Sequence, residues 1–403
     1  MGAMSDNKFD VVIVGAGIAG AALANLLANT GLSVAIVDAG QVPMSEPSRT
    51  SEFSDIDARV LALTEASKDV FEKAGVWSAV EAKGVSPYKE MTVWDAEGTG
   101  TLSFDCADVD KNALGYIVEN RVLVWALQQQ LLKTSTTLFS GQRLQAIAYQ
   151  NGAVTIDLEG GLQLSAQLLV GADGAASMVR VAMGGDCHII DNKQKAIVCH
   201  IETQRNHGDM ARQRFLSTGP LALLPVADVG ENVSSIVWSC DTDYADELLA
   251  LSDTEFCERL SAAAESVLGD VLAATPRLAF PLVARHAVDY TAANTVLIGD
   301  AAHVVHPLAG QGINLGLSDV AVLAEQLTKA VAKGLRVSNV RALAAYQRHR
   351  RGDNLRMIAL TQTFRHLFSG DALPVRWIRN FGMNTVDGQP ALKRAIIKQA
   401  MGL

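Results

Sequence analysis

The chain opens with a short β-branched run, a cluster of glycines and a stretch of helical character. These features cover residues 9–14, 15–20 and 21–29, and a second apolar run at 32–37 ends on Asp38. Apolar runs of this length between turn residues are typical of buried strands. The pattern therefore predicts a βαβ unit at the start of the chain.

A change of pattern after Arg180 predicts a second layer. The short runs that predict its strands are residues 196–202, 212–216, 221–224 and 234–239. Ser252 and Glu255 then form a capping box that opens a helix. We expect a sheet with a helix packed on it.

The C-terminal part has a helical pattern. It begins near Ser338, and Leu392, Ile396 and Ala400 recur at four-residue spacing beside basic residues. Residues 341–403 carry eleven Lys or Arg against three Asp, a net charge of +8, whereas the remainder is −17. A helix packing on its own domain is the preferred interpretation, and peripheral membrane contact or an acidic partner stays open.

Length and composition limit the class of protein. A chain of 403 residues predicts two or three domains, and 49% hydrophobic against 19% charged residues provides ample material for burial. No membrane-spanning run, signal peptide or nucleic-acid module is recognised, so we expect a cytoplasmic protein. The five cysteines lack a Cys-x-x-Cys spacing, which predicts reduced core thiols and no metal site.

The glycines after the first strand carry the first functional signal. Gly15 permits a tight turn, Gly17 lets the backbone approach a pyrophosphate, and Gly20 lets helix and strand pack closely. Asp38 can accept hydrogen bonds from ribose hydroxyls. The predicted dinucleotide site comprises Gly15, Gly17, Ile18, Ala19, Gly20 and Asp38.

A second glycine-rich segment follows the apolar run at 295–298. An aspartate at the mouth of a strand can bind ribityl hydroxyls, and backbone N–H groups at the next helix N-terminus suit a flavin. The predicted contacts are Gly299, Asp300, Pro307, Gly310, Gln311, Gly312, Ile313 and Asn314. His303 and Pro307 are flavin-adjacent candidates for catalysis, but His303 suits a structural role equally, and no catalytic residue is assigned.

These motifs carry a family resemblance. Residues 299–303 with 307–316 resemble the second FAD fingerprint of the class A flavoprotein monooxygenases related to para-hydroxybenzoate hydroxylase. Residues 168–174, with Asp173, resemble the middle Asp-Gly motif of that family, and Arg59 and Arg121 match family arginines near FAD. Pro281-Leu282 and residues 350–355 make the ubiquinone-biosynthesis hydroxylases the nearest group.

The resemblance implies the cofactor, the fold and the reaction. It implies FAD, an electron donor that is NAD(P)H or a redox protein, and dioxygen. The reaction would be hydroxylation of a polyprenylated phenol through a flavin hydroperoxide, within an assembly of ubiquinone-pathway proteins or as a homo-oligomer. Another FAD-dependent aromatic hydroxylase or oxidoreductase of the same fold, or a non-catalytic FAD-containing assembly subunit, remains an alternative.

The predicted fold is α/β, with an α+β substrate part. Because the cofactor motifs lie near residues 15, 171 and 299, the Rossmann-like FAD-binding domain must be assembled from separate segments. We expect this domain at 4–75, 106–183 and 280–345, an inserted β-sheet substrate domain at 76–105 and 184–279, and a C-terminal helical region at 346–403.

Overall fold

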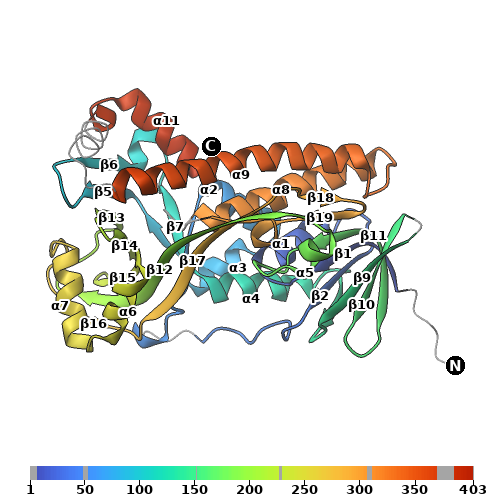
Figure 1. The fold of residues 1–403 in the computed structure, drawn as a ribbon, viewed down its shortest axis with the longest axis horizontal. Coiled ribbons are helices and arrows are strands. Elements are labelled where there is room, and N and C mark those ends of the chain that lie inside the picture. Colours follow the sequence, from blue (N-terminus) through green and yellow to red (C-terminus); the bar gives the residue numbers. More distant parts are fainter. Residues whose placement is uncertain are drawn as a thin grey trace.

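Two large sheets and the helices around them make up the protein (Figure 1). The computed structural model describes residues 7–48, 53–150, 152–226, 229–305, 311–369 and 385–402. The long strands β12 and β17 run along the middle of the molecule, between the first sheet and the strands that pack beside α6 and α7 (Figure 1). The predicted α/β class is confirmed.

The first sheet contains the predicted βαβ unit. Its strands are β1 (Lys8–Val14), β2 (Val34–Asp38), β8 (Thr137–Ser140), β9 (Leu144–Gln150), β10 (Ala153–Leu158), β11 (Gln163–Gly171), β18 (Thr291–Ala292) and β19 (Thr295–Leu297). The central order β19-β11-β1-β2-β8 is parallel throughout. The carboxyl ends of β1, β11 and β19, which precede the three sequence motifs, therefore lie side by side.

The second sheet is largely antiparallel. Its strands are β5 (Glu90–Asp95), β6 (Thr101–Asp105), β12 (Cys187–Thr203), β13 (Met210–Leu216), β14 (Gly219–Pro225), β15 (Val233–Asp241), β16 (Val271–Ala274), β17 (Leu278–Ala287) and β20 (His303–Val304). The four strands predicted after Arg180 are confirmed as parts of β12 to β15. A small third sheet contains β3 (Val60–Leu63), β7 (Gly115–Glu119) and β4 (Ser86–Tyr88).

The second sheet has two different faces, because side chains alternate along a strand. Ile197 and Cys199 of β12 and Trp238 of β15 belong to a buried cluster with residues of α6 and α7. The alternate residues, such as Val198 and Val237, face the opposite side and line a cavity. This second face is the one that bears on function.

Helices cover the first sheet and the outer face of the second. They are α1 (Ile18–Leu27), α2 (Glu65–Lys73), α3 (Trp77–Lys83), α4 (Asn120–Leu131), α5 (Met178–Ala182), α6 (Thr242–Ala250), α7 (Asp253–Ala263), α8 (Gln311–Ala332), α9 (Val340–Ser369) and α11 (Pro390–Met401), with the short η1 (Phe53–Asp55), η2 (Cys106–Val109) and η3 (Gly299–Ala301). The capping box at Ser252 and Glu255 is confirmed. No helix in the described part of the chain is both long and apolar enough to span a membrane.

Helix α11 packs on its own chain, but through a different face from the one expected. Ile397 and Met401 are buried in a small cluster with η2, whereas Leu392 is exposed. The buried side of α11 is therefore displaced by one residue from the predicted stripe of Leu392, Ile396 and Ala400. Lys393, which starts this side, lies 3.5 Å from Asp108. The division into domains by residue number stays a prediction.

Candidate active site

The glycine turn after β1 has the geometry expected of a phosphate-binding turn. Gly15 has a φ of +105°, and a Cβ at this position would lie 2.3 Å from the Ala172 carbonyl oxygen. A Cβ on Gly20 would lie 1.9 Å from the Gly15 carbonyl oxygen. A Cβ on Gly17 would meet nothing within 4 Å. The first two glycines thus permit close packing, while Gly17 leaves open space before the α1 N-terminus.

Asp38 lies at the carboxyl end of β2, directly beside this turn. One carboxylate oxygen accepts a hydrogen bond from Ala16 N at 2.6 Å, and the other accepts one from Gly40 N at 2.7 Å. An ionised carboxylate has about four lone-pair positions, so acceptor capacity remains for a sugar hydroxyl. Asp38 therefore fixes the turn and can still bind a ribose.

The middle motif joins the first turn to the last one. Asp173 accepts hydrogen bonds from Ser177 Oγ and from Met178 N, and so caps α5. The buried Arg180 donates to the carbonyl oxygens of Ala175 and Ala301, both at 2.7 Å. Arg180 is thus a clamp between the middle motif and η3, a role that sequence reasoning did not assign.

The segment after β19 brings an acid to the cavity. Gly299 has a φ of +58°. A Cβ on Gly316 would lie 3.2 Å from the Cα of Gly299, so η3 and α8 approach closely here. The Asp300 side chain is exposed, and it lines the cavity. Desolvation by the protein around the cavity raises the pKa of Asp300, although His303 and Arg59 act in the opposite direction.

The start of α8 divides its residues between the cavity and the protein interior. Gly312, Ile313 and Gly316 line the cavity. The buried Asn314 side chain instead accepts from Thr64 N at 3.0 Å and donates to Ala62 O at 2.9 Å, and so joins α8 to β3. Gln311 begins the helix. Pro307 and Gly310 lie outside the described residues.

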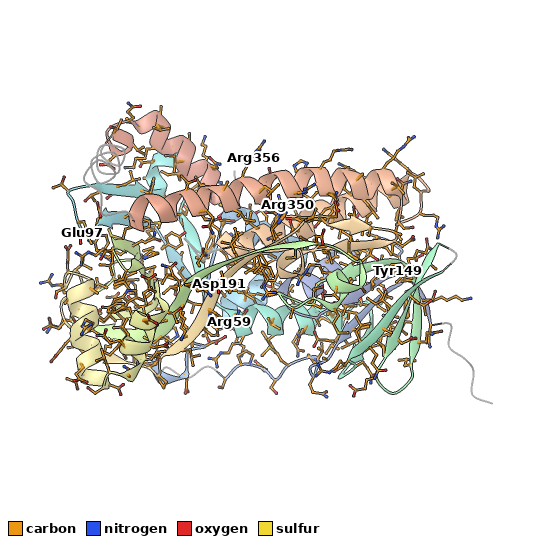
Figure 2. The ribbon with its side chains drawn as sticks, viewed as in Figure 1. Arg59, Glu97, Tyr149, Asp191, Arg350 and Arg356 are labelled. Carbon is orange, nitrogen blue, oxygen red and sulfur yellow. The ribbon has the colours of Figure 1, made fainter. Side chains whose placement is uncertain are left out.

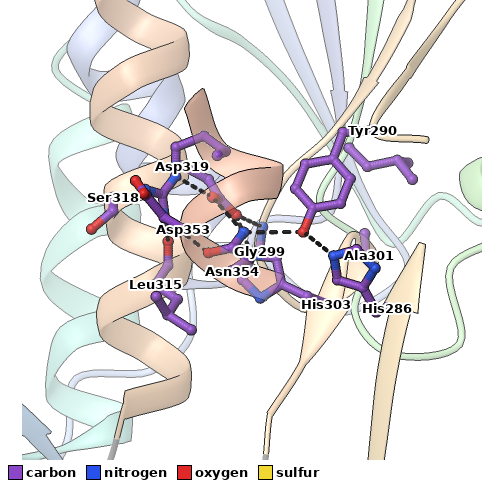
Figure 3. A network of polar contacts seen from close by, with 12 residues as sticks. His286, Tyr290, Gly299, Ala301, His303, Leu315, Ser318, Asp319, Asp353 and Asn354 are labelled. Atoms are coloured by element: carbon purple, nitrogen blue, oxygen red, sulfur yellow. Dashed lines mark hydrogen bonds and ion pairs between the residues drawn. The ribbon is translucent and has the colours of Figure 1, made fainter. Parts of the chain in front are cut away.

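Asp319 of α8 is the centre of a buried polar network (Figure 3). It accepts from His303 Nε2 at 2.6 Å, Gly299 N at 3.0 Å and Arg350 Nε at 2.7 Å. Burial alone would raise the pKa of Asp319, but His303 and Arg350 more than offset this, so the pKa lies below its ordinary value. His303 Nε2 therefore donates its hydrogen to an ionised carboxylate.

The same network continues into α9 and β17. Asn354 donates to Tyr290 OH at 3.1 Å, and Tyr290 OH lies 3.1 Å from His286 Nε2 (Figure 3). Arg350 lies under α9 at 5% side-chain exposure, whereas Arg356 is 85% exposed on the outer side of that helix (Figure 2). His303 thus belongs to a network that supports the end of β19, and it is not among the residues that line the cavity.

The two predicted cofactor arginines point to different places. Arg59 lines the cavity, and its guanidinium lies 5.7 Å from the centre of the Phe280 ring. Arg121 donates to Glu119 at 2.7 Å and to the Asp55 carbonyl oxygen at 2.5 Å, and it is not among the residues lining this cavity. The structure therefore brings Arg59 together with Asp300, while Arg121 braces the loop before β3.

A cavity of about 660 Å³ lies between the first sheet's motifs and the inner face of the second sheet. Its volume falls within the range of about 300–1,000 Å³ typical of ligand sites. On one side it is lined by Gly17, Gly174 and Asp300. On the other it is lined mainly by apolar side chains of β12, β14, β15 and β17. A dinucleotide and an apolar second ligand can therefore meet in one space.

The residues present fit FAD, because the space in front of Gly17, the acid Asp300 and the α8 N-terminal backbone open onto the same cavity. A family model described as FAD binding domain matches residues 8–359. The chain belongs to this FAD-binding family. The predicted cofactor FAD is thereby confirmed.

Full-length relatives narrow the class within this FAD-binding family. The chain is 35% identical to the 3-demethoxyubiquinol 3-hydroxylase of Escherichia coli, over 99% of this chain and 100% of that protein. It is 36% identical to the ubiquinone hydroxylase UbiL of Rhodospirillum rubrum, over 99% of this chain and 90% of that protein. The predicted resemblance to ubiquinone hydroxylases and the predicted class, an FAD-dependent aromatic monooxygenase, are confirmed.

Solved structures agree on the fold. PqsL of Pseudomonas aeruginosa superposes with a TM-score of 0.75 at 25% identity, over 94% of this chain and 100% of that chain. The p-nitrophenol 4-monooxygenase PnpA of Pseudomonas putida superposes with a TM-score of 0.76 at 17% identity, over 98% of both chains. The flavoprotein hydroxylase architecture thus covers nearly the whole chain.

Proposed function

We propose that this protein hydroxylates the aromatic ring of a polyprenylated phenol in ubiquinone biosynthesis, with NAD(P)H or a redox protein as electron donor and dioxygen as co-substrate. The observation that carries the proposal is the single cavity shared by the FAD motifs and the apolar face of the second sheet. The names of the full-length relatives, which are ubiquinone hydroxylases, support this choice of substrate.

Residues of the first sheet would hold the cofactor. The open space at Gly17 and the α1 N-terminus would receive the pyrophosphate, Asp38 the adenosine ribose, and Asp300 the ribityl chain. When bound, FAD supplies the electron transfer and the activation of dioxygen. The backbone of Gly312 and Ile313 would then face the flavin end of the cofactor.

Residues of the second sheet would orient the substrate and exclude water. Val198, Leu224 and Val237 form part of an apolar wall that suits an aromatic ring and the start of a polyprenyl tail. Phe280 is 38% exposed and also lines the cavity, so it lies where the cavity meets solvent. The tail would leave the cavity past this side chain.

An isotope experiment tests the proposed reaction. The purified chain with FAD, NADH or NADPH and a short 2-prenylphenol is exposed to ¹⁸O₂, and the product is analysed by mass spectrometry. We expect one labelled oxygen atom on the ring. A product that lacks the label, or reduced flavin that only releases hydrogen peroxide with every phenol tried, contradicts the proposal.

A binding experiment tests the cofactor site separately. Asp300→Ala should lower FAD retention, because it removes the carboxylate proposed to bind the ribityl hydroxyls. Asp289→Ala is the control, since Asp289 lies in the loop after β17, where its carboxylate accepts a hydrogen bond from Gln347 Nε2 at 3.3 Å. Equal FAD retention in both variants would contradict this part of the proposal.

The predictions about partners stay predictions. They concern an assembly with other pathway proteins, a homo-oligomer and peripheral membrane contact through the basic C-terminal region.

A further inference from the structure

Two polar side chains lie opposite each other on the cavity side of the second sheet. His200 of β12 pairs with Ser235 of β15 in the antiparallel register, next to the Val198 and Val237 pair. Directly opposite residues in such a ladder share a face, with Cβ atoms about 4.5–5.5 Å apart. Ser235 and its neighbour Val237 line the cavity. His200 therefore lies on the same face of the sheet as Ser235, although only Ser235 is among the residues that line the cavity.

Both side chains contain a buried polar atom with no hydrogen-bond partner among the described residues. These atoms are His200 Nδ1 and Ser235 Oγ, and each residue is only 1% exposed. Buried polar groups in proteins are almost always hydrogen-bonded, and an exception calls for an explanation such as a ligand or a catalytic role. Ser235 lines the cavity and His200 lies opposite it on the neighbouring strand, so the two open positions indicate a site for a polar group of a ligand.

The contact of the other ring nitrogen determines the form of His200. Nε2 lies 3.0 Å from the backbone carbonyl oxygen of Asp57, which can only accept, so Nε2 bears the hydrogen. Burial lowers the pKa of His200; the Asp57 contact acts against this, and Arg121 acts with it. In the neutral ring Nδ1 is therefore a bare acceptor on the strand opposite Ser235, and the two side chains do not hydrogen-bond to each other in this structure.

We propose that Ser235 binds the hydroxyl group of the phenol and relays its proton to His200 Nδ1. The inference rests on the proposed function, since it needs a phenol in the cavity. In this step the Ser235 hydroxyl turns about its Cα–Cβ bond toward His200, takes the proton of the phenol O–H and gives its own hydrogen to Nδ1. One phenol O–H bond breaks, one N–H bond forms, and the Ser235 hydroxyl is restored. The products are a phenolate oxygen and an imidazolium ring, and no electrons are exchanged.

A weak base is sufficient at this position. When the ring carbon gains an oxygen atom, the ring loses electron density and its hydroxyl becomes strongly acidic, so a neutral imidazole can take the proton at that stage. Tyr88 also lines the cavity, but burial raises its pKa to about 12. Asp300 is the sole carboxylate among the described lining residues, and it belongs to the cofactor side.

The FAD-loaded protein tests the relay with a matched pair of ligands. The probes are 2-prenylphenol and its methyl ether, which has no hydroxyl hydrogen to donate, and their dissociation constants are measured on the oxidised protein. The wild type should prefer the phenol, Ser235→Ala should lose this preference, and Ser235→Thr should keep it. Ser234→Ala is the control, because Ser234 is equally buried on the opposite face of β15.

Turnover tests the role of His200. Ser235→Ala and His200→Gln should each lower the hydroxylation rate about 10²-fold or more, the range of general acid–base effects, with FAD content unchanged. In the wild type the rate should fall as the pH drops through the lowered pKa of His200, because the imidazolium cannot accept a proton. His200→Gln should abolish this acid limb, and the control His207→Gln, at another buried histidine, should retain it.

The outcomes separate this inference from the proposed function. An unchanged preference for the phenol in Ser235→Ala, or an acid limb that persists in His200→Gln, overturns the relay. A wild type that binds the phenol selectively but never hydroxylates it contradicts the proposed function, while the ligand comparison still decides whether Ser235 binds the hydroxyl. The Ser235 variants decide this even where His200→Gln fails to fold.

Discussion

The carboxylate of Asp319 accepts a hydrogen bond from His303 Nε2 at 2.6 Å, with both side chains almost completely buried. The same oxygen accepts from Gly299 N, whose neighbour Asp300 lines the cavity. An acid on α8 therefore fixes the backbone at the point where the first sheet presents Asp300. The support of the cofactor site and the stability of the fold depend on the same interaction.

Asp319→Asn should therefore destabilise the protein strongly. The variant leaves the buried guanidinium of Arg350 without its buried charge partner, which costs about 3–5 kcal/mol in comparable pairs. Chemical denaturation measures this loss. Glu325→Gln on the same helix is the control, because its exposed pair with Lys329 should contribute less than about 1 kcal/mol. A loss of similar size in both variants would contradict the interpretation.

The stability should fall in mild acid because of His286. Burial lowers its pKa from 6.5 to about 4, with His303 and Arg351 acting in the same direction. Between these two values the unfolded chain binds more protons than the folded one, so stability decreases as the pH falls, by up to about 1.4 kcal/mol per pH unit.

Replacement of His286 measures its share of this acid sensitivity. His286→Gln should flatten the curve of unfolding free energy against pH between about pH 6.5 and 4.5. The exposed His349 provides the control, since His349→Gln should leave the curve unchanged. A wild-type and a His286→Gln curve that stay parallel over this range would show that His286 does not contribute.

Local pattern was sufficient to predict the parts of the fold that depend on neighbouring residues. The βαβ unit, the glycine turn and the capping box at Ser252 each depend on residues close in sequence. The first half of β12 was missed, because residues 187–192 are mostly exposed there and show no apolar alternation. Its pairing with β17 comes from a distant part of the chain.

The supporting residues of the site could not be predicted from motifs in the same way. Asp319 meets His303 and Arg350 from positions 16 and 31 residues away, and Arg180 reaches Ala301 across 121 residues. A signal for Asp319 was nevertheless present. It lies in the apolar stripe of α8, four residues from both Leu315 and Leu323, and a charge at such a position needs a buried partner.

Arg180→Lys should loosen the connection between the middle motif and η3. The guanidinium donates to two carbonyl oxygens through two nitrogens, and a lysine has only one nitrogen on a flexible stem. We expect a loss of about 1.5–3 kcal/mol in unfolding free energy, together with weaker FAD binding. Arg336→Lys, at an exposed arginine with one carbonyl contact, should have little effect on either quantity.

The glycine turn allows the effects of packing and of cofactor binding to be separated. A Cβ on Gly20 would lie 1.9 Å from a backbone oxygen, whereas a Cβ on Gly17 would meet nothing within 4 Å. Gly20→Ala should therefore lower the free energy of unfolding of the cofactor-free protein. Gly17 has a φ of −72°, which alanine adopts without strain. The free energy of unfolding of Gly17→Ala should therefore lie within about 0.5 kcal/mol of the wild-type value.

FAD binding should instead be weakened in Gly17→Ala, although this variant is expected to fold with normal stability. In Gly17→Ala the added methyl group occupies the space proposed for the pyrophosphate, so the dissociation constant for FAD should rise about tenfold or more, an effect of at least 1.4 kcal/mol. Titration of the cofactor-free protein with FAD, followed by flavin fluorescence, measures this constant. Normal FAD affinity in Gly17→Ala would mean that the pyrophosphate binds elsewhere. The added methyl group would project into the open space in front of Gly17, which is the space proposed for the pyrophosphate.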